Sequence, residues 1–206
     1  MASPASRKPV MTLYSGAATV QSHSCRIVLY EKEVECQIQY VENGQHEELA
    51  ELNPYNETPT LVDRELVLYG PQIINEYLDE RLPHPPLMPV DPVNRGRARL
   101  MILRILRDWY ELIDKAGGER PVLDARSRQV FRDGLISISP IFHERPYMMG
   151  IEFSLVDCFM APILWRLPLY GIDLPHQARP IAEYADRLFE RDSFVASLSE
   201  AENEIR

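Results

Sequence analysis

The feature that most constrains the fold is a proline-rich segment in the middle of the chain. Five prolines lie between Pro83 and Pro92, counting both ends. Because proline has no backbone N–H and a fixed φ, this segment is too rigid and too poor in donors for a helix or a central strand. We therefore expect residues 83–92 to be a linker between two parts, 10–82 and 93–206. Residues 1–9, which are mostly small, polar or proline, are interpreted as a disordered tail.

The part before the linker alternates between strand-like and helix-like patterns. β-prone runs span residues 10–14, 36–41, 60–63 and 66–69, and helical patterns cover about residues 22–33, 47–52 and 71–82. A helix between the first two strands requires a parallel pair, whereas the short connection at Arg64-Glu65 suits an antiparallel hairpin. The predicted order is therefore βαβαββα around a mixed sheet.

The part after the linker is predicted to be entirely helical. The helices cover about residues 93–115, 121–142, 155–170, 178–189 and 194–201. The first of them has an apolar face that we expect to enter the core, with Leu100, Leu103, Leu106 and Ile113. Another face is basic and carries Arg95, Arg97, Arg99, Arg104 and Arg107. Two interpretations of this stripe remain: a solvated face that pairs with acidic neighbours, or a contact between subunits.

Two polar features of the helical part are interpreted as structural. Ser154 and Asp157 stand three residues apart before an apolar run, a pattern that resembles a capping box with aspartate in place of glutamate. We prefer this role for Asp157 over that of a catalytic acid. At the end of the chain, Glu200, Glu202 and Glu204 are interpreted as a solvated tail.

Charge and composition exclude several functions. The chain has 22 basic and 31 acidic residues and a net charge of −9, which repels nucleic acid and anionic lipid. The most apolar stretch, 153–172, is interrupted by charges and prolines, so it does not predict a membrane span. The first residues lack the apolar core of a secretory signal. Three cysteines without CxxC spacing predict neither a disulfide framework nor a zinc site. We expect a cytoplasmic protein without a metal or cofactor and without direct contact with nucleic acid or membrane.

The order of elements and three local motifs resemble the glutathione transferase superfamily over about residues 10–200. Asn53-Pro54 with residues 57–61 is similar to the segment of that family whose proline is cis. The resemblance implies that Pro59 is cis and that the backbone of Thr58 lies at the ligand cleft. Residues 22–33 are similar to the family's first helix, and residues 153–157 to its capping box. The implied fold is an N-terminal thioredoxin-like domain followed by a helical domain.

Several longer motifs closely resemble one branch, the stringent starvation protein A family. They are residues 26–29, 61–66, 76–81, 83–90, 154–158, 164–168 and 189–194. For that family the resemblance implies a dimer, homomeric or heteromeric, that binds RNA polymerase holoenzyme with its σ subunit. It also implies that Pro83, His84, Pro85 and Pro86 form the partner-binding surface.

The resemblance places the glutathione-binding residues where this chain has altered chemistry. Active relatives hold the γ-glutamyl end of glutathione with an acidic residue and a serine at the start of the third helix. Here those places are taken by Gly70 and Pro71, and starvation proteins commonly retain the acidic-serine pair. Two lost contacts to a charged group, at about 1.5–3 kcal/mol each, correspond to an affinity about two to four powers of ten weaker.

The position of the catalytic cysteine or serine in active relatives falls near Thr19. We weigh a thiolate-stabilising role for Thr19 against ordinary loop polarity and prefer the latter. Cys25 is expected to be a buried or half-buried thiol in the first helix. We interpret Thr19, Thr58, Pro59, Gly70 and Pro71 as a vestigial ligand cleft.

The hypothesis that combines these observations is a transcription regulator that acts by protein contact with RNA polymerase and has no glutathione transferase activity. The alternatives are a glutathione-dependent transferase or reductase, and a sensor whose cleft holds another small molecule.

Overall fold

A computed structural model describes residues 11–42, 46–118 and 121–206, so the expected tail at residues 1–9 lies outside the described residues. The first part of the chain follows the predicted order. It consists of β1 (Met11–Ser15), α1 (Val20–Glu31), β2 (Gln37–Tyr40), α2 (Glu47–Leu52), β3 (Thr60–Asp63), β4 (Leu66–Tyr69) and α3 (Pro71–Arg81).

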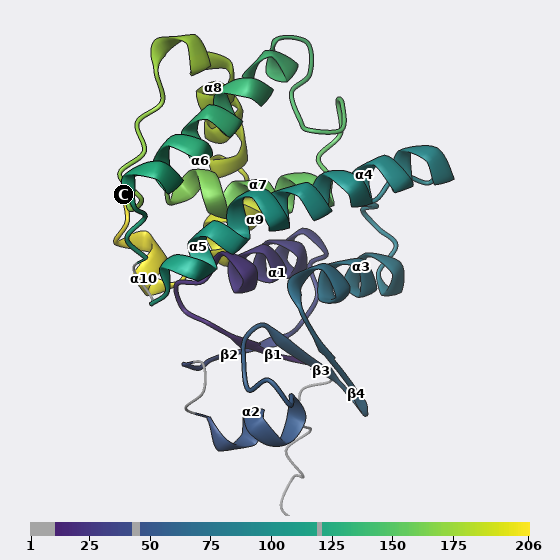
Figure 1. Ribbon diagram of the computed structural model, residues 1–206. Helices are drawn as coiled ribbons and strands as arrows, with labels where there is room; N and C mark the ends of the chain where they lie inside the picture. Colours follow the sequence, from purple (N-terminus) through teal and green to yellow (C-terminus); the bar gives the residue numbers. More distant parts are fainter. Residues whose placement is uncertain (1–10, 43–45, 119–120) are drawn as a thin grey trace, which may run out of the picture.

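These strands form one mixed sheet in the order β2-β1-β3-β4. β1 and β2 are parallel, with Leu13 opposite Ile38, and β3 is antiparallel to both β1 and β4. Figure 1 shows α2 on the outer face of the sheet and α1 and α3 on the face toward the second part. The predicted thioredoxin-like fold is confirmed.

The second part is helical, as predicted, but its elements are shorter and more numerous. It contains α4 (Pro92–Ile105), a π-helical turn (Leu106–Tyr110), α5 (Glu111–Ala116), α6 (Ala125–Ile138), a 3-10 turn (Ser139–His143), α7 (Leu155–Trp165), a 3-10 turn (His176–Ala178), α8 (Arg179–Phe189), α9 (Asp192–Ser197) and α10 (Glu200–Asn203).

The single helix predicted over residues 194–201 is wrong for a local reason. Leu198 and Ser199 adopt extended conformations, with ψ of 131° and 168°, and Leu198 ends regular helical geometry. The Ser199 hydroxyl then accepts a bond of 3.2 Å from the backbone N–H of Glu202 and starts a new helix. The helix predicted over residues 93–115 is likewise interrupted by the π-helical turn, whose wider winding shifts the residues that follow it.

The predicted core face of the first long helix is only partly correct. Ile113 is buried, and Leu106 packs partly buried against the core, but Leu100 and Leu103 are 57% and 41% exposed. The buried face of α4 instead carries Ala98, Ile102 and Ile105. The helix has two apolar stripes, and the spacing alone did not show which one faces α7.

Helix α1 joins the two parts through one shared core. It packs against α3 on one side and against α7 and α9 on the other. Cys25 of α1 and Cys158 of α7 are free, fully buried thiols within this core. Burial raises the pKa of the Cys25 thiol to about 12 and raises that of Cys158 well above its usual range. Both thiols are therefore protonated at neutral pH.

Among the described residues, none of the helices combines the length and apolar character needed to cross a membrane. The part of the chain that the structure describes also contains no group of three or more His, Cys, Asp or Glu side chains that could hold a metal ion.

Candidate functional site

The first candidate site is the surface formed by Pro83, His84, Pro85 and Pro86, which we call the 83–86 segment. All four residues are exposed and lie in neither a helix nor a strand. The peptide bond between His84 and Pro85 is cis. The segment therefore presents proline rings and an imidazole directly to solvent.

Buried contacts hold this exposed segment in place. The Asp79 carboxylate of α3 accepts bonds from the backbone N–H groups of Leu87 (2.8 Å) and Met88 (3.1 Å), whose side chains are buried. It also pairs with the Lys32 ammonium at 2.7 Å. Lys32 donates a second bond to the carbonyl of Pro85. One buried ion pair thus fixes the backbone on the C-terminal side of the 83–86 segment.

The second candidate site is a cleft of about 710 Å³ between the two parts. It is lined by Thr19, Thr58, Pro59, Gly70 and Pro71 among others, so the structure brings together the residues of the predicted vestigial cleft. The Thr58-Pro59 peptide bond is cis, which confirms the expectation for Pro59. Leu106 and Tyr110, from the π-helical turn, add an apolar wall.

The start of α3 has little to offer to a bound carboxylate. Gly70 precedes the helix with φ of +86° and has no side-chain cap, and Pro71 is the first helical residue. The carbonyl of Gly70 accepts the N–H of Ile74 at 3.1 Å. Proline supplies neither a hydroxyl nor an N–H. The residues present at this helix start therefore do not fit the γ-glutamyl end of glutathione.

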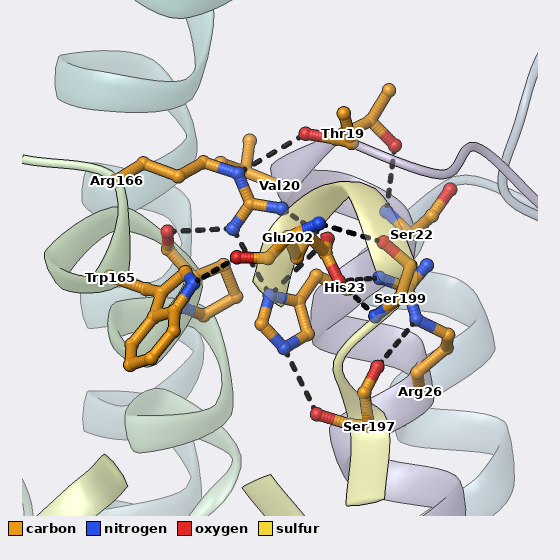
Figure 2. A network of polar contacts seen from close by, with 12 residues as sticks. Thr19, Val20, Ser22, His23, Arg26, Trp165, Arg166, Ser197, Ser199 and Glu202 are labelled. Carbon is orange, nitrogen blue, oxygen red and sulfur yellow. Dashed lines mark hydrogen bonds and ion pairs between the residues drawn. The ribbon is translucent and has the colours of Figure 1, made fainter. Parts of the chain in front are cut away.

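Thr19, which lines the cleft, has a structural role as a helix cap. It is the N-cap of α1, and its hydroxyl accepts a bond of 3.4 Å from the N–H of Ser22. Figure 2 shows this hydroxyl directed toward the start of the helix. A cap of this kind stabilises a helix start by about 1 kcal/mol.

Beside the cleft lies a buried polar network that the sequence interpretation missed (Figure 2). Glu202 of α10 pairs with Arg26 of α1 at 2.5 Å and also with Arg166, which follows α7. All three side chains are at most 1% exposed. The Arg166 guanidinium also donates to the carbonyl of Ala18 at 3.1 Å. The network thereby connects the C-terminal helix to both parts of the fold.

His23 occupies the centre of this network as a neutral ring. A guanidinium N–H of Arg166 lies 3.0 Å from Nδ1, which must accept because arginine only donates, and Nε2 then donates to the Ser197 hydroxyl at 2.9 Å. Burial lowers the pKa of His23 well below its usual range. Burial opposes ionisation of Glu202 as well, but the Arg26 and Arg166 guanidinium groups that bind its carboxylate lower the pKa of Glu202 to about 2.

The interpretation of Glu202 as part of a solvated tail is therefore wrong. Its side chain is fully buried because two guanidinium groups require a partner in the core. A signal was present in the sequence: Ser199 and Glu202 have capping-box spacing, and both bonds of the box form. The capping box that was predicted from the sequence, at Ser154 and Asp157, is confirmed: Asp157 accepts the N–H of Ser154 at 2.9 Å and the Tyr184 hydroxyl at 2.7 Å.

The fold and the cleft define the class of protein. Residues 9–80 match the family model of the glutathione S-transferase N-terminal domain. The structure is similar to a theta-class glutathione S-transferase from the citrus canker pathogen Xanthomonas axonopodis pv. citri, solved with glutathione bound. The TM-score is 0.81 at 18% identity, over 93% of this chain and 98% of that one. This likeness establishes a glutathione-transferase fold.

More similar sequences identify the branch. The chain is 48% identical over 202 residues to a stringent starvation protein A homolog from Coxiella burnetii, covering 97% of each protein. It is also 48% identical to a homolog of that name from Pasteurella multocida, over 96% of this chain and 94% of that one. The chain belongs to the stringent starvation protein A family.

Proposed function

We propose that this protein is a transcription regulator that binds RNA polymerase holoenzyme, with its σ subunit, through the 83–86 segment. The observation that carries the proposal is an exposed proline segment held by a buried ion pair. Membership of the family supports it, and so does the net charge of −9, which favours a protein partner over nucleic acid. We place the protein in the cytoplasm, without glutathione transferase activity.

A segment of this kind suits a docking role for a thermodynamic reason. Proline restricts the backbone before binding, and the Lys32–Asp79 pair holds the segment on the fold, so little conformational entropy is lost on association. The proline rings offer flat apolar faces. His84 would add hydrogen bonding or stacking and would not need to transfer a proton.

We further propose that the protein acts as a dimer through α3 and α4. Most homo-oligomers are two-fold symmetric dimers. Ile73 of α3 is 58% exposed, and Leu100 and Leu103 of α4 are exposed as well. Arg99 of α4 forms a two-bond contact with Glu76 of α3, at 2.7 and 2.9 Å. This pair holds α3 and α4 together, so that their exposed residues form one continuous face with apolar and basic groups.

The direct test is co-purification of the full-length chain with RNA polymerase holoenzyme. We expect the wild-type protein to be retained, and the variant with Pro83→Ala, His84→Ala and Pro85→Ala to be lost. A control with Pro175→Ala and His176→Ala changes the same residue types at another proline–histidine pair, where His176 is exposed. Thermal unfolding of each variant verifies that the fold persists.

Two outcomes would distinguish a wrong docking surface from a wrong binding partner. Retention of the triple variant would reject the 83–86 segment as the docking surface. Failure of the wild-type protein to bind holoenzyme would reject the polymerase partner.

The alternative is a glutathione-dependent transferase or reductase, which the intact cleft and the cis Pro59 favour. Retention on immobilised glutathione, together with turnover of a chlorinated aromatic substrate, would support it. We expect neither, because Gly70 and Pro71 lack the groups that hold the γ-glutamyl end.

A further inference from the structure

Among the described residues, the charged groups that line the cleft are of one sign. Three carboxylates line it: Glu57 before β3, and Glu111 and Asp114 of α5. Within the described residues, no lysine, arginine or histidine lines the cleft. Lys115 pairs with Glu111 at 3.3 Å in an exposed contact, and the amide of Gln21 donates to Asp114 at 2.5 Å.

The cleft also has a buried polar group that is independent of these acids, the hydroxyl of Tyr170. Tyr170 lines the same cleft and is only 2% exposed, yet its hydroxyl has no hydrogen-bond partner among the residues that the structure describes. Burial raises the pKa of Tyr170; the positive charge of Arg166 opposes this shift, and the charge of Asp114 adds to it. A buried hydroxyl without a partner is costly, so this group would gain a hydrogen bond from a molecule that reached it in the cleft.

Much of the remaining lining is apolar or aromatic, beside the polar side chains of Thr19, Gln21, Thr58 and Gln72. Tyr110 and Tyr170 contribute rings, and Val20, Leu106 and Ile113 contribute aliphatic groups. The hydroxyl of Tyr110 is already bonded to the carbonyl of Phe159 at 2.9 Å, so its ring acts as a wall. Apolar walls with few polar groups are typical of sites for small organic molecules, and about 710 Å³ is within their usual size.

We propose that this cleft binds a small organic cation, an ammonium group carried on an apolar or aromatic body. The ammonium group would lie toward Glu57 and Asp114, and the body would lie against Tyr110 and Tyr170. A hydrogen-bonding atom on the body would meet the Tyr170 hydroxyl.

The partial positive charges at two helix starts oppose the binding of a cation, so their size must be compared with the negative charge of the carboxylates. The starts of α1 and α3 both border the cleft, and each helix start contributes about half a positive charge. Together they offset about one carboxylate. Lys115 offsets much of another, at Glu111. Among the described lining residues the balance stays negative by about one charge, so this lining disfavours anions such as glutathione and favours cations.

The experiment uses three probes that share one indole ring and differ in charge. Isothermal titration calorimetry on the full chain would compare tryptamine, a cation, with tryptophol, which is neutral, and indole-3-acetate, an anion. We expect tryptamine to bind most tightly and indole-3-acetate at least about tenfold more weakly. Equal or tighter binding of indole-3-acetate, or no heat from tryptamine at millimolar concentration, would overturn the proposal.

Variants then locate the site. Glu57→Gln and Asp114→Asn remove one charge each while keeping shape, and each should weaken tryptamine about fivefold without affecting tryptophol. Tyr170→Phe should weaken both of these probes. Glu183→Gln is the matched control, because Glu183 is an exposed acid on α8, outside the cleft lining. If neither acid variant changes the affinity for tryptamine, tryptamine binds elsewhere and the cleft is rejected as its site. Because these readouts do not involve polymerase, they stand apart from the test of the 83–86 segment.

Discussion

Arg26 and Glu202 are 176 positions apart in the sequence, and their side chains meet in an ion pair of 2.5 Å with no exposed surface. Arg166 binds the second carboxylate oxygen of Glu202, so one acid serves two guanidinium groups. Taking such groups out of water is costly, and the pairing recovers that cost only while all members are present. The last helix of the chain is therefore an integral part of the fold.

Replacing Glu202 with glutamine should destabilise the protein strongly. The variant Glu202→Gln leaves two buried guanidinium groups without a counter-charge, a change that typically costs about 3–5 kcal/mol. Urea unfolding followed by circular dichroism measures this loss. The control is Glu200→Gln on the same helix, which is exposed and should change the free energy of unfolding by less than about 0.5 kcal/mol. Equal stability of the two variants would show that the network contributes no stabilisation.

Stability should also fall in acid in two stages. The folded pKa of His23 lies below its usual 6.5, so the unfolded chain takes up this proton first and stability declines below about pH 6.5. Glu202 has a folded pKa of about 2 against an ordinary value of 4.5. Its contribution, up to about 3 kcal/mol, is present above pH 4.5 and is lost between 4.5 and 2.

Urea unfolding at a series of pH values between about 7 and 3 measures both stages. The Glu202→Gln variant should lack the second stage and keep a decline near pH 6. A second stage of the same size in that variant would assign it to other carboxylates.

The sequence predicted much of this fold, because local patterns carry its information. The βαβαββα order and the capping box at Ser154 are each specified by a few neighbouring residues, the cis Pro59 was implied by the family resemblance, and the structure contains all three. The exposure of Leu100 and Leu103 was not predictable in this way. An apolar stripe at helical spacing does not say which neighbouring element covers it, and α4 has more than one such stripe.

The candidate sites show the same division between local and distant information. The family resemblance places Gly70 and Pro71 at the cleft, and their residue types then indicate altered chemistry, since proline has no N–H wherever it lies. The pairing of Arg26 with Glu202 joins segments 176 positions apart. The unpaired state of the Tyr170 hydroxyl is an absence of partners among the residues that the structure describes. Spacing within a single sequence does not encode such relationships.

The anchoring of the 83–86 segment can be tested without a partner. Asp79→Asn removes the charge that pairs with Lys32 and weakens the bonds to the N–H groups of Leu87 and Met88. A hydrogen bond to a charged group is worth about 1.5–3 kcal/mol. Hydrogen exchange should therefore show protection of these two amides falling at least about tenfold. Asp133→Asn, at an exposed acid of α6, should leave both amides unchanged. Unchanged protection in Asp79→Asn would mean that other contacts hold the segment.

The exposed face of α4 predicts the effect of charge on assembly. Leu100→Glu with Leu103→Glu places two like charges on each copy of the proposed dimer face, and a two-fold contact brings all four together. Light scattering after gel filtration should give the mass of a dimer for the wild-type chain and of a monomer for this variant. Val195→Glu is the control, since Val195 is a 59% exposed apolar residue on α9 and should leave the dimer intact. A dimeric double variant would move the interface away from α4.

The chemistry of the α3 start can be tested by giving back what proline lacks. Pro71→Ser supplies a hydroxyl and a backbone N–H at the first position of a helix whose positive end faces the cleft. One or two bonds to a carboxylate at about 1.5–3 kcal/mol each should raise glutathione affinity at least about tenfold over the wild-type chain. Gly70 is left in place, because its φ of +86° would strain any other residue. Chemical-shift titration with millimolar glutathione measures weak affinities of this kind, and Pro71→Ala, which returns the N–H without the hydroxyl, separates the two donors. If Pro71→Ser binds glutathione no better than the wild-type chain, the missing donors are not the main obstacle, and the acidic lining of the cleft takes that role.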